Sequence, residues 1–231
     1  MMPSDDMVLT VTLRSEGTFG RGDGVAGLLD AETEYDEETG LPHIRGRRLK
    51  GLLVECCADI LFGLSRGEGY PPALDRAAGF LFGRPGSRAE DRGRLHVGTA
   101  AMPSDLATAI REDVRAGRLA PADVLEALTT VRRQTALGDG TCAPEGGSLR
   151  SARCVLRGTA LAARLSFRET PDGTALGLLA ACISALHRGG SVRNRGRGRL
   201  RAGLAADGAE VTGACLDAFE ALVKAYAGET A

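Results

Sequence analysis

The chain has 231 residues, of which 43% are apolar and 26% charged, a balance that excludes intrinsic disorder and allows a buried core. Aromatic residues are only 4% of the chain and tryptophan is absent, so an aromatic platform for stacking bases is not expected. The net charge of −1 excludes a uniformly basic coat for nucleic acid. Among the 29 basic residues only Lys50 and Lys224 are lysines; a GC-rich gene would explain this bias, and arginine's planar fork also suits phosphate.

No segment has the features of a targeting or membrane-spanning element. Residues 1–6 are polar and acidic and lack the apolar stretch of a signal peptide. No apolar run approaches the roughly 20 residues that a membrane span needs. The six cysteines form no C-x-x-C pair and have no histidine at metal-binding spacing, so neither a zinc knuckle nor a disulfide framework is expected. We therefore expect a soluble cytoplasmic protein without membrane contact.

Hydrophobic periodicity predicts the order of the elements. Alternating apolar residues are typical of strands, spacings of three and four are typical of helices, and clusters of glycine and proline indicate loops. In chain order we expect a strand at 7–13, a long acidic loop at 17–40, a helix at 47–62, a surface insertion at 63–93, a short strand at 95–98, helical patterns at 106–114 and 124–131, a protruding hairpin at 132–153, a strand at 161–167, a helix at 176–186, a loop rich in glycine and arginine at 187–201, a last strand and a C-terminal helix.

Without the insertions, this order is strand, helix, strand, repeated once. That is the split βαβ plan of a ferredoxin-like domain, similar to an RNA-recognition motif. We therefore predict an α+β fold with a ferredoxin-like core, insertions and a protruding hairpin. The expected single domain over 1–231 has a core at about 7–62, 94–101 and 158–204, an insertion at about 63–93, a helical and hairpin segment at about 102–157, and a C-terminal helix at about 213–227.

One glycine motif resembles a nucleotide site only superficially. Residues 22–27 match G-x-G-x-x-G, the dinucleotide-binding fingerprint. The fingerprint needs a helix that receives a pyrophosphate, whereas these glycines open a loop with seven carboxylates, and Asp23 lies inside the motif. A nucleotide site is not expected there.

Two basic segments are candidates for contacts with a polyanion. The first opens the helix at 47–62, where cations oppose the helix dipole unless an anion lies among them. Its cations, which could equally form a solvated turn balanced by the acidic loop, are Arg45, Arg47, Arg48 and Lys50. The second is the loop at 187–201, which contains no acid and whose glycines allow the backbone to approach a nucleic acid. Its candidate RNA-binding residues are Arg193, Arg195, Arg197 and Arg199.

The sequence from Asp30 to Gly51 resembles the opening signature of the RAMP superfamily of CRISPR proteins. In backbone subunits of type III effector complexes the region reads Asp, six residues to a second Asp, then T-G-x-P-x-I-P-G-S-S-L-K-G. Asp30 and Asp36 have this spacing, and Arg45 and the pair at 47–48 are the departures.

The resemblance continues in order to about Gly203. Residues 80–83 and 93–97 resemble the family's F-G and r-l-x-v segments, and the glycines at 189–198 resemble its glycine-rich loop. The hairpin resembles the family's thumb, which adds Arg132, Arg133 and Arg150 to the expected RNA-binding residues.

The resemblance implies a guide-RNA-binding backbone subunit that assembles with copies of itself and with other subunits of a CRISPR effector complex. It also implies cleavage of the complementary target RNA with a divalent metal, magnesium or manganese, at Asp30, which would be both the catalytic residue and the metal ligand. Among the loop carboxylates, Glu32 and Glu34 would tolerate substitution far better.

Two other functions remain open from the sequence. A purely structural subunit would bind guide RNA without cutting, and would differ from the first only in the role of Asp30. A guide-processing endoribonuclease of the same superfamily would need a general base, for which the three histidines are candidates.

Overall fold

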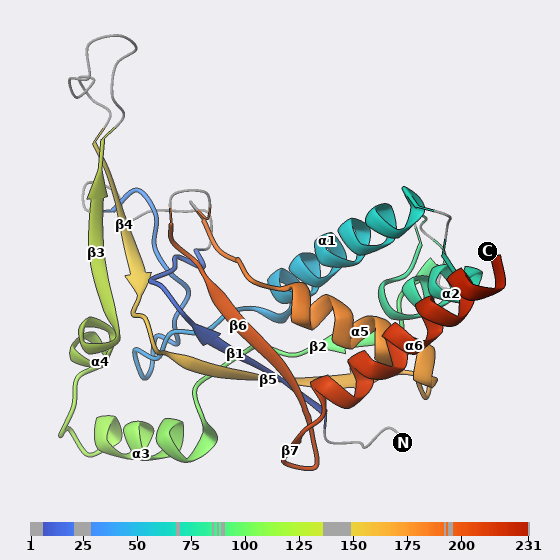
Figure 1. The fold of residues 1–231 in the computed structure, drawn as a ribbon. Helices are drawn as coiled ribbons and strands as arrows, with labels where there is room; N and C mark the ends of the chain where they lie inside the picture. The colour runs from blue at the N-terminus through green and yellow to red at the C-terminus, as the bar shows by residue number, and fades with distance from the viewer. Residues whose placement is uncertain are drawn as a thin grey trace, which may run out of the picture.

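The computed structural model describes residues 7–20, 29–67, 70–84, 86, 88, 91–135, 149–191, 193 and 196–230. Figure 1 shows the elements along the chain. They are β1 (Met7–Leu13), α1 (Gly46–Ser65), α2 (Pro72–Phe82), β2 (Leu95–Val97), α3 (Ser104–Arg115), α4 (Pro121–Leu128), β3 (Thr129–Gln134), β4 (Arg150–Val155), β5 (Ala160–Phe167), α5 (Gly173–Ala185), β6 (Leu200–Ala206), β7 (Ala209–Glu210) and α6 (Thr212–Thr230). No helix in these ranges is long and apolar enough to cross a membrane.

The main sheet has the strand order β2-β5-β1-β6-β7, and every neighbouring pair is antiparallel. Strand β1 lies in the centre because Met7, Leu9, Val11 and Leu13 alternate and are all buried on one face. Leaving out the short β7 and the hairpin, the order is that of a ferredoxin-like sheet. The predicted α+β, ferredoxin-like fold is therefore confirmed.

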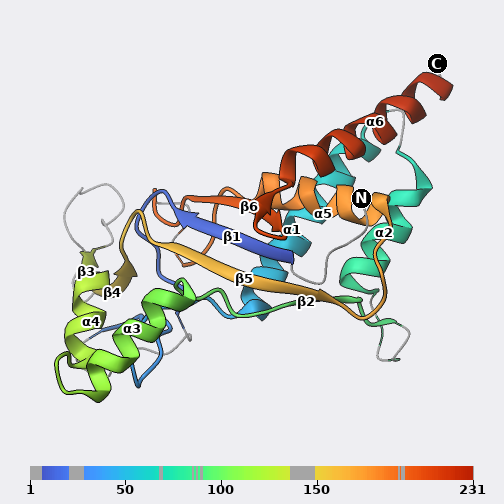
Figure 2. The same ribbon diagram turned by 90° about the horizontal axis from the view of Figure 1, so that it is seen from below.

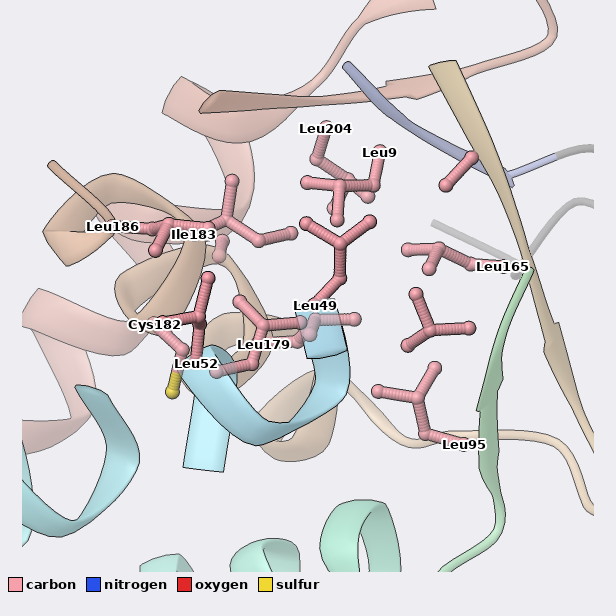
Figure 3. Packing of buried hydrophobic residues seen from close by; sticks show 14 of the residues in the cluster. Leu9, Leu49, Leu52, Leu95, Leu165, Leu179, Cys182, Ile183, Leu186 and Leu204 are labelled. Carbon is pink, nitrogen blue, oxygen red and sulfur yellow. The ribbon is translucent and has the colours of Figure 1, made fainter. Parts of the chain in front are cut away.

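The core lies between one face of this sheet and the helices α1 and α5 (Figure 2). Leu49 from α1 and Leu179 from α5 face Leu9 and Leu165 of the sheet, as Figure 3 shows. Helix α5 is buried nearly all round because α6 covers its other side, where Phe219 of α6 packs against Gly177. This second helical layer explains why the sequence of α5 is apolar without a polar face.

The structure corrects two of the expected elements. The segment interpreted as a surface insertion contains α2, whose residues Leu74, Ala77 and Leu81 recur at helical spacing and belong to the core. The flanking glycines and prolines masked this short pattern; Pro72 in fact occupies the first turn, where proline is favourable. The helical pattern expected at 124–131 ends at Leu128, and Val131 lies in β3 instead.

Strands β3 and β4 form a separate two-stranded sheet that projects from the rest of the structure (Figure 1). The register pairs Thr129 with Val155 at the base and Gln134 with Arg150 farther out. The base joins the main body through a bridge between Gly17, just after β1, and Val155. The predicted protruding hairpin is therefore present in the described part of the segment.

Candidate functional site

Asp30 lies beside β4, near the outer end of the described part of the hairpin. The backbone N–H of Asp30 donates to the carbonyl of Ser151 at 2.9 Å, and Arg153 N–H donates to the carbonyl of Ala31 at 3.0 Å. These bonds form a short parallel bridge between Ala31 and Ala152. The acidic loop is therefore fastened along β4 at this point.

The carboxylate of Asp30 is oriented by the same neighbour. Ser151 donates its backbone N–H to Asp30 Oδ2 at 2.6 Å and its hydroxyl to the same oxygen at 3.2 Å. The backbone hydrogen bond lowers the pKa of Asp30, and the charge of Arg150 lowers it further. The exposed group is therefore an anion at neutral pH.

We tested whether this position suits the divalent metal that the resemblance implies. Carboxylate oxygen is the ligand type that magnesium and manganese prefer. The described residues contain no cluster of three acidic, histidine or cysteine side chains that could hold a metal by themselves. One oriented carboxylate does fit magnesium, which commonly binds through one or two carboxylates together with substrate phosphates and water.

Two further carboxylates of the acidic loop are tied to arginines. Glu32 Oε1 lies 2.9 Å from Arg153 Nε, and both side chains are largely buried. Glu34 is only 4% exposed, and its Oε1 lies 3.2 Å from Arg45 Nε. Glu32 and Glu34 hold the loop against the hairpin and against α1, so their replacement by alanine would also loosen the loop. Removing Glu32 would leave the partly buried Arg153 without its carboxylate partner, whereas removing Glu34 would release the exposed Arg45.

Asp36, the second aspartate of the signature, makes a turn. Its Oδ1 accepts from the N–H groups of Glu38 at 2.8 Å and Thr39 at 3.2 Å. Gly40 follows with φ +75°, and a Cβ there would come within 1.9 Å of the carbonyl oxygen of Pro121 in α4. The two aspartates of the signature therefore differ: Asp30 presents an exposed carboxylate, whereas Asp36 stabilises a turn.

The four cations at the start of α1 do not converge on one point. Arg45 pairs with Glu34, Arg48 donates to the carbonyl of Gly20, and Lys50 Nζ donates to the carbonyl of Leu95 at 2.7 Å. Burial lowers the pKa of Lys50, because the charged amine loses water there. Arg47 is exposed and has no ion pair with a described residue.

These different surroundings predict different results for two substitutions. Arg47→Ala should weaken RNA binding and reduce the slope of its salt dependence by about one unit, as the loss of one phosphate contact would. Lys50→Met should instead lower the free energy of unfolding by about 1–3 kcal/mol, because the buried carbonyl of Leu95 loses its charged donor. Urea unfolding and salt titrations of RNA binding measure the two effects separately. Equal effects of both substitutions on RNA binding, with unchanged stability, would contradict this assignment.

The hairpin arginines lie along its exposed edges. Arg132 forms a two-pronged ion pair with Glu16, with its Nε 2.7 Å from Glu16 Oε2, and this partner lowers the pKa of Glu16. Arg133 on β3 and Arg150 on β4 are exposed. The three residues expected from the resemblance therefore lie on one projection, with Arg132 linked back to the main sheet.

The glycine-rich loop folds back onto the end of β1. Gly189 N–H donates to the carbonyl of Gly198 at 2.8 Å, and Gly198 N–H donates to the carbonyl of Glu16 at 2.7 Å. Gly198 has φ +67°, and a Cβ there would come within 1.9 Å of the Gly189 carbonyl oxygen. Glycine is therefore required at position 198 because two segments of the protein backbone approach each other closely there.

The arginines of this loop have different surroundings. Arg193 Nη1 lies 2.7 Å from Glu55 Oε2 of α1, and Arg199 is exposed. Arg197 is partly buried, and its Nη1 has no hydrogen-bond partner among the described residues. Arg195 lies outside the described residues, as do the G-x-G-x-x-G segment and the far part of the hairpin.

Glu16 and Ser151 are two residues that the sequence analysis missed. Glu16 touches both the hairpin, through Arg132, and the glycine-rich loop, through its carbonyl. Ser151 holds Asp30, which is 121 positions away in the chain. Neither residue lies in a recognisable motif, and no local pattern could have indicated contacts between such distant segments. Through these two residues, Asp30 and the glycine-rich loop are both linked to the hairpin that carries the arginines.

Comparison with known proteins identifies solved structures with the same fold. No protein-family model matches the chain, and no curated protein matches it in sequence. A chain in the cryo-EM structure of type III-B Cmr-beta in the apo state matches with a TM-score of 0.59, at 13% identity, over 88% of this chain and 98% of that one. The chain has the fold of a type III-B Cmr-beta subunit. A second match, in Cmr-beta bound to cognate target RNA, has a TM-score of 0.57 at 14% identity over 87% and 98% of the two chains. The sequence resemblance to type III effector subunits is thereby confirmed at the level of the fold.

Proposed function

We propose that the chain is a guide-RNA-binding backbone subunit of a type III CRISPR ribonucleoprotein, and that it cleaves the complementary target RNA at Asp30. The observation that supports the proposal is the position of Asp30 on the hairpin strand β4. There an exposed, oriented carboxylate lies beside a projection with arginine edges. The fold shared with Cmr-beta chains, one of them in a structure with target RNA, supports it.

Guide binding would rely on arginines that face solvent. Arg47, Arg133, Arg150 and Arg199 are exposed, and none of them has an ion pair with a described residue. Contacts of this kind reach the phosphates and sugars, so they would hold guides of any sequence. Arg132 and Arg193 could join them once a phosphate replaces Glu16 or Glu55.

Cleavage would rely on the carboxylate of Asp30. Ser151 donates twice to Oδ2, so Oδ1 would be the oxygen that meets a metal or the RNA. When bound, a divalent metal would stabilise the charge that develops on the phosphate. Asp30 would hold that metal or accept the proton of the attacking 2′-hydroxyl, and in-line attack by this hydroxyl on the adjacent phosphate would leave a cyclic phosphate on the upstream product.

Co-purification tests the guide-binding part of the proposal. The chain, expressed together with the products of its neighbouring genes and a repeat–spacer array, should purify with RNA of defined length that contains spacer sequence. Nuclease digestion and sequencing of the bound RNA measure this directly. A complex that assembles without spacer RNA, or that carries only random cellular RNA, would contradict the proposal.

A further inference from the structure

A polar hollow lies at the end of the main sheet that is remote from the hairpin. Its lining comes from α2, from Arg84, Asp91 and Arg94 between α2 and β2, and from Glu169 just after β5, whereas β3 and β4 lie at the opposite end in both views (Figures 1 and 2). Its volume is about 420 Å³, within the range of sites for small molecules. Three arginines line it: Arg76, Arg84 and Arg94.

Among the described residues that line this hollow, arginines outnumber carboxylates. Arg94 Nε lies 2.5 Å from Glu169 Oε1, and Asp91 accepts the backbone N–H of Arg88 at 3.1 Å through Oδ2. Arg76 and Arg84 line the same hollow and form no ion pair with a described residue. Within the described part of the chain, no carboxylate neutralises these two guanidinium groups, which would suit an anionic ligand.

The side chain of Arg84 is folded back into the hollow. It lies against Gly79, where an added Cβ would meet Arg84 Nε at 3.1 Å and Nη2 at 3.7 Å. Gly79 is in the interior of α2, where alanine would favour the helix more than glycine does. The absence of a side chain at this position gives the guanidinium of Arg84 its place beside the helix.

We infer that this hollow binds a nucleoside monophosphate, either free or at the end of an RNA strand. Two arginine forks match the geometry and the double negative charge of one terminal phosphate. Phe80 is partly exposed and lines the same hollow, where its ring supplies an apolar wall for a base. Asp91 and Glu169 oppose a more highly charged ligand such as a triphosphate. The inference does not depend on guide binding or on Asp30.

Calorimetric titration of the purified chain with uridine 5′-monophosphate tests the site. The nucleotide should bind measurably, and uridine and inorganic phosphate should each bind at least about tenfold more weakly. Arg76→Ala and Arg84→Ala should each reduce affinity for the nucleotide by about tenfold or more. Equal affinity for uridine and its monophosphate, or unchanged affinity in both variants, would overturn the inference, as would equal affinity for phosphate alone.

Two further variants separate binding from folding. Gly79→Ala should displace Arg84 and weaken nucleotide binding while leaving the thermal midpoint equal or higher. Phe80→Leu keeps an apolar side chain but removes the ring, so it should weaken binding of the nucleotide more than of phosphate. Arg115 is an exposed arginine on α3, so Arg115→Ala is the matched control and should change neither nucleotide binding nor phosphate binding. Full nucleotide affinity in a folded Gly79→Ala variant would count against the role of Arg84.

A pair of short RNAs distinguishes the two sources of the ligand. If the site takes the end of a strand, a 5′-phosphorylated tetranucleotide should bind more tightly than its 5′-hydroxyl form, and Arg84→Ala should remove the difference. If the site takes free nucleotides, the two RNAs should bind equally while uridine 5′-monophosphate retains its Arg84-dependent affinity. Either result supports the proposed site. If Arg84→Ala changes the affinity for none of the probes, the site is refuted. Guide co-purification by the same variant shows independently whether the hairpin site is intact.

Discussion

Asp30→Ala should abolish cleavage of a complementary RNA while leaving guide and target binding intact. A carboxylate that accepts a proton in the reaction contributes about 10²- to 10⁴-fold to the rate, and loss of a metal ligand at the same position would add to this. Binding should persist because a negatively charged group repels phosphate. The measurement is single-turnover cleavage of labelled RNA by the assembled complex with magnesium or manganese, alongside a target-binding titration.

The choice of control follows from the structure. Glu32 and Glu34 are unsuitable as neutral controls because both are in ion pairs that hold the loop. Glu38 is exposed in the same loop, and only its backbone takes part in the Asp36 turn, so Glu38→Ala should cleave at the parental rate. Undiminished cleavage by the Asp30 variant would reject catalysis at this residue and support a purely structural subunit.

Reversal of three charges in the glycine-rich loop should have the largest effect on guide binding. In a variant with Arg193, Arg195 and Arg197 changed to Glu, three phosphate contacts are lost and three repulsions are introduced. The slope of log affinity against log salt should fall by about two units, and affinity should fall similarly for unrelated RNA sequences. Fluorescence anisotropy with two RNAs of different sequence, at several salt concentrations, measures both effects.

A matched reversal elsewhere controls for net charge. Arg115 and Arg157 are exposed and lie outside the loop, so their change to Glu should affect binding only weakly at moderate salt. Because Arg197 is partly buried near Glu16, its replacement by Gln provides a variant without a buried repulsion. A strongly sequence-dependent loss, or the same loss in the control reversal, would show that the loop does not bind the phosphate backbone.

The sequence predicted the ferredoxin-like core because each of its elements has a local signal. The alternation from Met7 to Leu13 specifies the central strand, and the apolar spacing at Leu49 and Leu53 specifies α1. The short α2 was missed because its flanking glycines and prolines resemble a loop, although Leu74, Ala77 and Leu81 have helical spacing. Local sequence patterns were therefore enough to predict the sheet and most of the helices that cover it.

The site was less predictable because its contacts join distant segments. The positions of Asp30 and of the arginines came from motifs, but their partners did not. The ion pair between Arg132 and Glu16 spans 116 positions, and the link between Lys50 and the Leu95 carbonyl depends on how α1 packs beside β2. A basic motif in a sequence indicates where cations lie along the chain, whereas only the fold shows which of them already have partners.

If Asp30 cleaves RNA, the parallel bridge between Ala31 and Ala152 would set the position of the cut relative to the hairpin. Asp30 is attached to β4 itself, so its distance from any point along that strand is set by the rise of about 3.3 Å per residue. If the hairpin displaces a nucleotide of the target, the phosphate presented to Asp30 keeps a constant offset from that nucleotide. Lengthening the hairpin by a pair of residues beyond Ser151 would then shift the displaced nucleotide relative to the cleaved bond without altering the chemistry at the carboxylate.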